Sequence, residues 1–197
     1  MRDSVRAPPK ILLYRPAMRV AFFGGSFNPP HVAHQLVALY VLETEPVDEL
    51  WLVPCWKHPF DKVLAPYADR LQMCRLAAAA LGSRVKVSDV EGRLGGESRT
   101  LRTIKALQQE RPDCQLHLVV GADIEPELPS WYGAEELLRM VPRIVVGRGP
   151  HAGKSPVAMP AVSSTEVRRR LASGDGVAGL VPSSVADYIR EHRLYTE

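Results

Sequence analysis

Short apolar runs alternate along this chain with longer segments in which apolar residues recur at helical spacing. The runs at 19–23 and 49–53 are almost continuously apolar, which is typical of strands that are buried on both faces. The segment 67–81, rich in Ala and Leu, is typical of a helix. The whole pattern predicts strands at 19–23, 49–53, 84–90, 115–120 and 143–146, and helices at 36–43, 67–81, 99–110, 134–140, 164–173 and 183–192.

This serial alternation of strands and helices predicts an α/β fold: a Rossmann-like, doubly wound parallel sheet followed by two C-terminal helices. Right-handed crossovers in such a fold place ligands at the carboxyl ends of the strands. A ligand site is therefore expected in the loops after Phe23, Val53, Val90, Val120 and Val146.

The chain has 197 residues, of which 46% are hydrophobic, so its length and apolar content fit one globular domain. Three prolines, Pro8, Pro9 and Pro16, interrupt the first segment, and basic residues are distributed through it. We therefore expect residues 1–17 to form a disordered N-terminal extension and residues 18–197 to form the single domain.

The charged residues nearly balance, because 25 Lys and Arg against 22 Asp and Glu give a formal charge of +3. A protein that binds nucleic acid through bulk charge carries a larger basic excess, so we expect local anion binding and no nucleic-acid partner. Cys55, Cys74 and Cys114 are far apart, which argues against disulfides and a cysteine-rich zinc site. No apolar run is long enough to span a membrane, so we expect no membrane partner and a cytoplasmic protein. The sequence leaves open whether the chain forms a homo-oligomer.

The segment 24–34 lies between the first strand and the first helix and carries the most specific chemistry of the chain. Gly24 and Gly25 would let backbone N–H groups approach an anion closely, and the start of the helix adds unpaired donors and a positive dipole end. Asn28 is placed to cap this helix, and Pro29 suits its first position. The segment therefore predicts a phosphate-binding turn.

Two histidines, His31 and His34, follow the glycines and lie three residues apart. On a helix this spacing puts both imidazoles on one face, toward whatever the glycine turn holds. The segment fits neither a Walker A loop nor a G-x-G-x-x-G dinucleotide fingerprint, and it lacks the Glu and the i, i+4 interval of a zinc-binding H-E-x-x-H motif. Phosphate contact is the favoured hypothesis. The alternative is that two structural histidines simply lie on a helix after a tight turn.

Residues 163–168 form a second candidate site nearer the C-terminus. Ser163 and Glu166 match a capping box, in which Ser163 is the N-cap of a helix and Glu166 its third residue. Arg168 and two further arginines follow near the start of this helix, where the dipole disfavours cations. A bound polyanion would offset that conflict, which favours phosphate binding by Arg168. The alternative is a purely structural cap.

The segment 24–34 resembles the opening signature of the nucleotidyltransferases with an H-x-G-H motif, and within them the nicotinate mononucleotide adenylyltransferases. That signature reads Gly-Gly-Thr/Ser-Phe-Asp/Asn-Pro-x-His-x-Gly-His, and Ala33 replaces its last glycine here. Residues 162–168 are similar to the second signature of the family, Ile-Ser-Ser-Thr-x-Ile/Val-Arg. Shorter resemblances to the Ser-Tyr-Thr, Gly-x-Asp and Trp segments of the family occur at 98–100, 121–123 and 129–132.

The resemblance implies a nucleotidyltransferase-type fold and a set of site residues. Catalytic roles are implied for His31, His34 and Arg168. ATP contacts are implied for Gly24, Gly25, Ser26, Phe27, His31, His34, Gly121, Asp123, Ser163, Ser164 and Arg168. Contacts to the second substrate are implied for Ser26, Phe27, Lys62, Thr100, Trp131 and Tyr132.

Several candidate residues have structural alternatives. Asp123 is placed either to hydrogen-bond ribose hydroxyls or to cap a helix. In the family, the tryptophan that corresponds to Trp131 stacks on the pyridine ring, and the alternative for Trp131 is ordinary core packing. Lys62 is preferred slightly over Lys57 as the basic residue that reaches the phosphates, and Arg148 after the last strand is a further candidate.

The resemblance implies adenylyl transfer from ATP to nicotinate mononucleotide, which forms nicotinate adenine dinucleotide and pyrophosphate in NAD biosynthesis. Mg²⁺ is the implied cofactor, bound mostly by substrate oxygens and water and not by a dedicated protein site. The alternatives are another adenylyl- or cytidylyltransferase, such as a pantetheine-phosphate adenylyltransferase, and a nucleotide-binding module without catalysis. Ala33 and Arg99, two departures from the family signatures, are the hints for such a module. The sequence does not distinguish a preference for nicotinate from one for nicotinamide.

Overall fold

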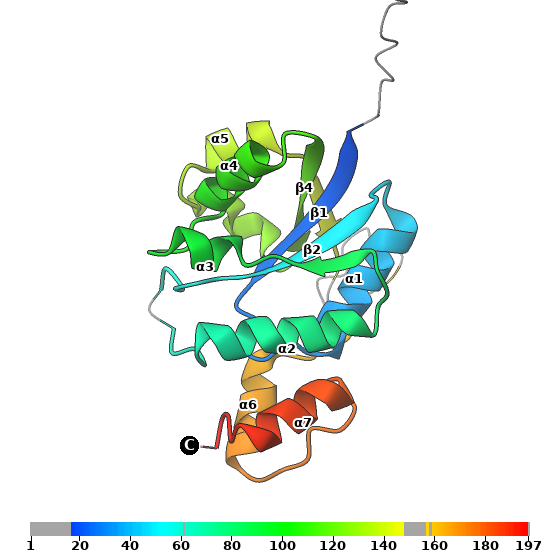
Figure 1. Cartoon of the computed structure of the whole chain (residues 1–197), viewed down its shortest axis with the longest axis vertical. Coiled ribbons are helices and arrows are strands. Elements are labelled where there is room, and N and C mark those ends of the chain that lie inside the picture. The colour runs from blue at the N-terminus through cyan, green and yellow to red at the C-terminus, as the bar shows by residue number, and fades with distance from the viewer. Residues whose placement is uncertain (1–16, 61, 148–156, 158, 197) are drawn as a thin grey trace, which may run out of the picture.

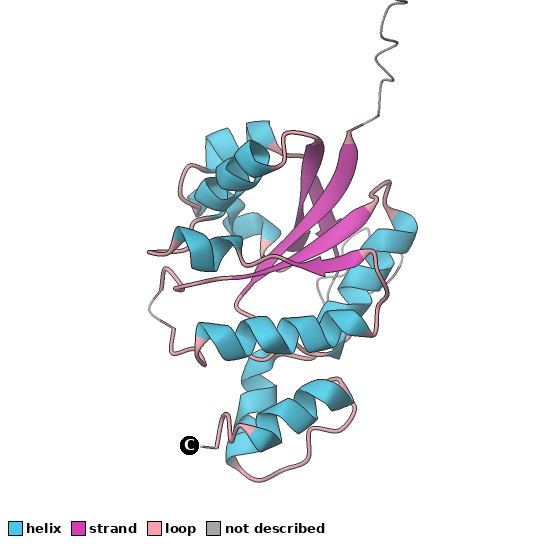
Figure 2. Ribbon diagram, viewed as in Figure 1, coloured by secondary structure: helices cyan, strands magenta, loops and turns pink. Residues whose placement is uncertain are grey.

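The described part of the chain contains a sheet of five parallel strands in the order β3–β2–β1–β4–β5 (Figures 1 and 2). The computed structural model describes residues 17–60, 62–147, 157 and 159–196, so residues 1–16 of the predicted extension and Arg148 lie outside the described residues. The strands are β1 (Met18–Gly25), β2 (Glu49–Pro54), β3 (Val85–Val87), β4 (Cys114–Gly121) and β5 (Arg143–Val146). The helices are α1 (Val32–Thr44), α2 (Tyr67–Ala79), α3 (Val90–Leu94), α4 (Thr100–Glu110), the 3₁₀ helix η1 (Glu125–Ser130), α5 (Ala134–Met140), α6 (Ser164–Ala172) and α7 (Ser183–Glu191).

Alternate residues of the strands point into two cores, one on each face of the sheet. In β1, Val20 and Phe22 face the core that is covered by α3, α4, η1 and α5. Ala21, between them, faces the core under α1 and α2. Both faces are therefore covered by helices (Figure 2), which confirms the predicted doubly wound sheet. β1 and β2 read as nearly continuous apolar runs because their middle residues are covered on both faces.

The order of the strands reverses at β1. β2 and β3 extend from one side of β1, whereas β4 and β5 extend from the other. The loops that leave the carboxyl ends of β1 and β4 therefore diverge and leave a crevice, which is where open α/β sheets bind ligands. This topology directs the search for a site to the loops after Gly25 and Gly121.

The C-terminal helices α6 and α7 pack beside α2 (Figure 1). The core that they share with α2 is separate from the two cores of the sheet and contains Met73, Ala77, Val167, Val185 and Ile189. Because α2 also contributes to the core under the sheet, it joins the C-terminal helices to the rest of the fold.

Two boundaries near the first loop differ from the prediction. β1 continues through Gly24 and Gly25, which pair with the end of β2, so these glycines belong to the strand and not to a turn. α1 begins at Val32 with His31 as its N-cap. The cap predicted at Asn28 was therefore wrong, because Asn28 is buried and its side chain bonds to other segments.

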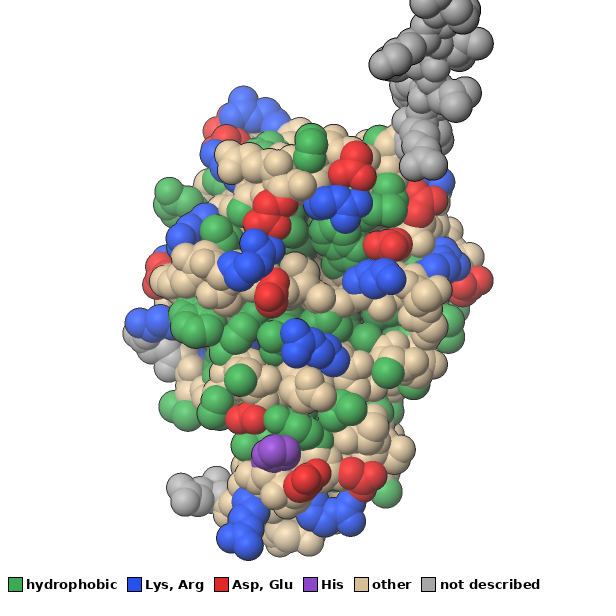
Figure 3. Space-filling model, viewed as in Figure 1, with side chains coloured by type: hydrophobic (Ala, Val, Ile, Leu, Met, Phe, Trp, Pro, Cys, Tyr) green, Lys and Arg blue, Asp and Glu red, His purple; other side chains and the backbone are tan. Residues whose placement is uncertain are grey.

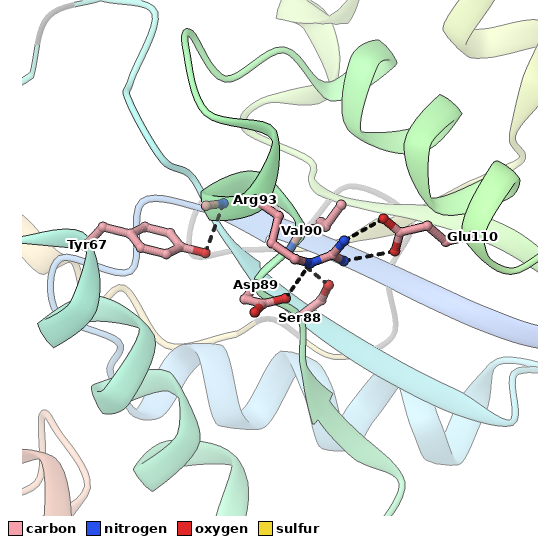
Figure 4. A network of polar contacts seen from close by, with 7 residues as sticks. Tyr67, Ser88, Asp89, Val90, Arg93 and Glu110 are labelled. Atoms are coloured by element: carbon pink, nitrogen blue, oxygen red, sulfur yellow. Dashed lines mark hydrogen bonds and ion pairs between the residues drawn. The ribbon is translucent and has the colours of Figure 1, made fainter.

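The third predicted strand is shorter than expected, because the chain turns into the short helix α3. Arg93 of α3 donates to Asp89 at 3.0 Å and makes two hydrogen bonds to Glu110 of α4, at 2.6 and 2.8 Å (Figure 4). The Tyr67 hydroxyl of α2 accepts a hydrogen bond from the Gly92 N–H group at 3.2 Å. These contacts hold a helical turn where a polar loop was predicted.

Arg70 of α2 is almost completely buried, with 1% of its surface exposed. Its guanidinium donates to four backbone carbonyl groups, those of Cys55 at 2.7 Å, Ser26 and Ala65 at 2.9 Å, and Trp56 at 3.2 Å. A buried cation is costly unless polar partners replace its water. Arg70 therefore acts as a clamp between the loop after β1, the loop after β2 and the turn before α2.

Charged side chains of both signs are mixed on the face of the molecule shown in Figure 3. The exposed ion pairs of the described residues include Arg84–Glu43, at 3.0 Å, and Lys105–Glu136, at 2.7 Å. The arrangement agrees with the near-balanced composition. None of the helices that the structure describes is long and apolar enough to cross a membrane.

We predict that Arg70→Met lowers the free energy of unfolding by about 3–5 kcal/mol, because it leaves buried carbonyl groups without their charged donor. Chemical denaturation measures this loss. Arg75→Met is the matched control, since Arg75 is exposed on the same helix, and it should change the stability by less than about 0.5 kcal/mol. Equal stability of the two variants would contradict the clamp.

Candidate active site

A cavity of about 430 Å³ opens at the carboxyl ends of β1 and β4. This volume lies in the usual range for sites that bind small molecules. Most of the predicted site residues line it: Gly24, Gly25, Ser26, His31, His34, Lys62, Thr100, Gly121, Asp123, Trp131 and Tyr132. The fold thus brings together groups from β1, the loop after β2, the start of α4 and the loop after β4.

Four predicted site residues are not part of the cavity wall. Phe27 is buried, with 2% of its surface exposed, and packs against His34. Ser163, Ser164 and Arg168 lie at the start of α6. Their contacts with ATP, and the contact of Phe27 with either substrate, stay predictions.

His31 and His34 lie in contact at the start of α1. Their rings stack with centroids 3.7 Å apart and planes inclined by 24°. The His31 backbone N–H group donates to Nδ1 of His34 at 3.1 Å, so a neutral His34 carries its proton on Nε2. Because His34 lines the cavity, its Nε2–H group is a donor suited to a phosphate oxygen.

The Phe27 ring packs against the His34 imidazole. The two rings meet edge to face with centroids 4.9 Å apart. The Phe27 backbone has a φ of +44°, a left-handed conformation that aromatic residues rarely adopt. Gly25 leaves space for this arrangement, since a Cβ atom there would lie 3.3 Å from the Phe27 ring. The glycine therefore makes room for the aromatic ring that holds the imidazole.

Two side chains of α6 form hydrogen bonds to the segment that joins β1 to α1. The Ser164 hydroxyl donates to the Pro29 carbonyl at 2.9 Å, and Arg168 Nη1 donates to the Asn28 carbonyl at 2.8 Å. Both bonds fix the backbone that leads into His31. In this structure Arg168 therefore positions the loop.

The cap predicted at Ser163 is confirmed, because its hydroxyl accepts a hydrogen bond from the Glu166 backbone N–H group at 3.2 Å. The Glu166 carboxylate pairs with Arg169 at 2.9 Å and with Arg170 at 2.8 Å, and these two guanidinium groups lower its pKa to about 2. α6 ends at Ala172, so Arg169 and Arg170 lie in its last turn, where the helix dipole favours cations, and both have an acidic partner. A polyanion is not needed to offset their charge, whereas Arg168 contacts the loop instead.

Gly121 and Asp123 line the cavity at the end of β4. A Cβ atom at Gly121 would collide with the Asp123 carboxylate, so glycine here lets that side chain fold back over the end of the strand. The N-cap of η1 is Ile124, and Asp123 therefore does not cap this helix. Ribose binding by Asp123 stays a prediction.

Trp131 and Tyr132 form another part of the cavity wall. Trp131 also packs against the core under α4 and α5. Part of its surface therefore has the structural role that was the alternative to ligand binding, and another part lines the cavity. Tyr132 is 64% exposed, and the Arg99 guanidinium lies 5.7 Å from the centre of its ring. Arg99 pairs with Glu97 at 2.7 Å and lines the same cavity as Trp131 and Tyr132.

The buried carboxylate of Glu91, which no motif in the sequence indicates, joins two loops of the cavity wall. Glu91 accepts hydrogen bonds from the Ser98 hydroxyl, from the Thr103 hydroxyl at 2.5 Å and from the Trp56 backbone N–H group at 3.3 Å. The Ser98 hydroxyl accepts from the same Trp56 N–H group at 2.9 Å. Ser98 thus connects the loop after β2 to the start of α4, beside Thr100.

Comparisons with known proteins identify the family. The model of the cytidylyltransferase-like family matches residues 22–170. The "Probable nicotinate-nucleotide adenylyltransferase" of Anaeromyxobacter dehalogenans (strain 2CP-C) is 48% identical over 183 residues, which cover 89% of this chain and 96% of that relative. The Myxococcus xanthus (strain DK1622) protein of the same name is 40% identical over 186 residues, covering 92% and 96%. The chain belongs to the nicotinate-nucleotide adenylyltransferase family.

As a member of this family, the protein is a nucleotidyltransferase. Its fold matches that of the Plasmodium falciparum nicotinic acid mononucleotide adenylyltransferase complexed with NaAD, with a TM-score of 0.75. The match covers 90% of this chain and 97% of that one at 22% sequence identity. It confirms the nucleotidyltransferase type of the predicted fold.

We predict that His34→Ala lowers the turnover of this adenylyltransferase by a factor of about 10² to 10³, the usual loss when one preorganised donor is removed. Steady-state kinetics measures the loss, and circular dichroism should show a native fold. Leu36→Ala is the matched control, because Leu36 is 43% exposed on the same helix and should leave turnover unchanged. Unchanged turnover of a folded His34 variant would contradict this role.

Proposed function

We propose that this protein transfers the adenylyl group of ATP to nicotinate mononucleotide and so forms nicotinate adenine dinucleotide and pyrophosphate in NAD biosynthesis. The observation that carries the proposal is that one cavity is lined both by the His31–His34 pair and by Trp131 with Arg99. The names of the Anaeromyxobacter and Myxococcus relatives support the same activity.

In the proposed reaction, a phosphate oxygen of nicotinate mononucleotide attacks the α-phosphorus of ATP, and the bond from that phosphorus to the pyrophosphate oxygen breaks. No protein nucleophile takes part, so catalysis depends on positioning and on charge placed where it develops. His34 donates from Nε2 to the phosphate oxygens as negative charge builds on the leaving pyrophosphate. The positive end of α1 and the Lys62 ammonium group add to this stabilisation.

Trp131 and Arg99 support a pyridine carboxylate as the acceptor. The flat indole of Trp131 matches a planar pyridine ring. A guanidinium binds a carboxylate more strongly than a neutral amide, so Arg99 favours nicotinate over nicotinamide. Glu97 binds Nε and Nη2 of Arg99, which leaves Nη1 as the nitrogen that we assign to the substrate.

Mg²⁺ enters this proposal together with ATP, held by phosphate oxygens and water. Among the residues that the structure describes, no group of three or more His, Cys, Asp or Glu is arranged to hold a metal ion. The cavity does contain the Asp123 carboxylate, an oxygen donor of the kind that Mg²⁺ prefers. The ion would neutralise phosphate charge when bound.

A cytoplasmic location is part of the same proposal. Cys55, Cys74 and Cys114 are free thiols, and a reducing compartment keeps thiols in this form. ATP and pyridine mononucleotides are the partners that the proposed reaction requires.

Pyrophosphate release tests the proposed acceptor, with ATP, Mg²⁺ and one of three candidates: nicotinate mononucleotide, nicotinamide mononucleotide or phosphopantetheine. We expect kcat/KM to be about tenfold or more higher with nicotinate mononucleotide than with its amide, since one charged hydrogen bond separates them. Arg99→Gln should reduce this preference toward parity. Arg102→Gln, an exposed arginine of the same helix, should leave it unchanged.

The remaining outcomes of this assay discriminate the alternatives. Release with phosphopantetheine alone would identify a different adenylyltransferase. Absence of release with every acceptor, from a folded protein, would support a nucleotide-binding module without catalysis.

A further inference from the structure

The segment after α7 returns to the loop that follows β1. The hydroxyl of Tyr195 donates to Oδ1 of Asn28 at 2.7 Å. Asn28 is 2% exposed, Tyr195 is half-buried, and burial raises the pKa of the Tyr195 phenol. Arg193 and Tyr195 have positive φ values of +50° and +63°, in the left-handed region that non-glycine residues seldom adopt. Such a backbone persists where the surrounding contacts fix it.

The Asn28 side chain, which accepts from Tyr195, also forms hydrogen bonds to the turn before α2. Its Oδ1 atom accepts a second hydrogen bond from the Ala65 backbone N–H group at 3.0 Å, and its Nδ2 group donates to the Val63 carbonyl at 3.4 Å. A flipped amide would turn its NH₂ group toward the Ala65 N–H group, which can only donate. Ala65 therefore sets the orientation of the Asn28 amide, and the Tyr195 hydroxyl holds the same oxygen in place.

The residues that Asn28 holds follow directly after Lys62, which lines the cavity. This loop has little apolar packing of its own, since Phe60 is 74% exposed and Val63 is 93% exposed. The Ala65 carbonyl accepts a further hydrogen bond from Arg70 at 2.9 Å. Polar anchors therefore fix this part of the loop where burial of apolar side chains does not.

We propose that Tyr195 is a positioning residue for adenylyl transfer. Through Asn28 it holds residues 62–65 so that the Lys62 ammonium group reaches the substrate phosphates. The role of Lys62 rests on the proposed function. The linkage from Tyr195 through Asn28 to Ala65 is a property of the fold and does not depend on that function.

A double-mutant cycle tests whether Tyr195 acts through Lys62. The value of kcat/KM for ATP is measured for the unmodified protein, Tyr195→Phe, Lys62→Ala and the double variant. Tyr195→Phe removes one hydroxyl and keeps the ring, so the fold should persist. We expect it to lower kcat/KM about 5- to 10-fold alone, and less than about twofold when Lys62 is already alanine.

Tyr188→Phe is the matched control for this cycle. The Tyr188 hydroxyl of α7 donates to Asp69 of α2 at 2.8 Å, so it too joins the C-terminal region to the rest of the fold, but its partner is not Asn28. Its loss should leave kcat/KM within about twofold of the unmodified protein. Equal losses from Tyr195→Phe in both backgrounds, or no loss at all, would overturn the proposal.

Amide hydrogen exchange at Ala65 tests the linkage without any assay of activity. Tyr195→Phe should speed exchange of the Ala65 N–H group by about tenfold, because its acceptor loses the hydroxyl that holds it in place, and Tyr188→Phe should not. Unchanged exchange at Ala65 would overturn the linkage. If the unmodified protein shows no turnover with nicotinate mononucleotide, the proposed function fails, and this exchange measurement still decides the linkage.

Discussion

The buried guanidinium of Arg70 is the interaction on which the site depends most. It joins backbone carbonyls from the loop after β1, the loop after β2 and the turn before α2, where apolar packing is sparse. A charge stays in the interior only when polar groups replace its water, so the carbonyls and the guanidinium stabilise each other. The same bonds hold Ser26 and Cys55 in place at the wall of the cavity.

A series of local contacts positions His31 and His34 on the loop that Arg70 holds. Gly25 leaves room for the Phe27 ring, Phe27 supports the His34 imidazole, and the His31 N–H group fixes which nitrogen of His34 carries the proton. Residues of α6 and the segment after α7 then hold the same loop through Asn28, although they lie 140 and 167 residues away along the chain. The orientation of one phosphate donor therefore depends on both ends of the domain.

The sheet and the loops that form the cavity could be predicted from the sequence, because continuous apolar runs report buried strands and parallel topology places their carboxyl ends together. The resemblance to the family, and not the apolar pattern, implied Lys62, Thr100, Trp131 and Tyr132. The role of Arg70 has a signal too, since residues 70, 73, 74, 77 and 78 form one buried stripe of α2, but an arginine on such a stripe is easily taken for a solvated one. Glu91 and Tyr195 have no periodic signal. Their partners are loops that only the tertiary structure brings near.

A crystal structure of the protein with nicotinate adenine dinucleotide bound tests this arrangement most directly. We expect the dinucleotide in the cavity at the carboxyl ends of β1 and β4, with a phosphate oxygen within hydrogen-bond distance of His34 Nε2 and the pyridine ring against Trp131. The Arg70 contacts should be unchanged. A dinucleotide bound elsewhere, or phosphates that contact neither His31 nor His34, would contradict the account.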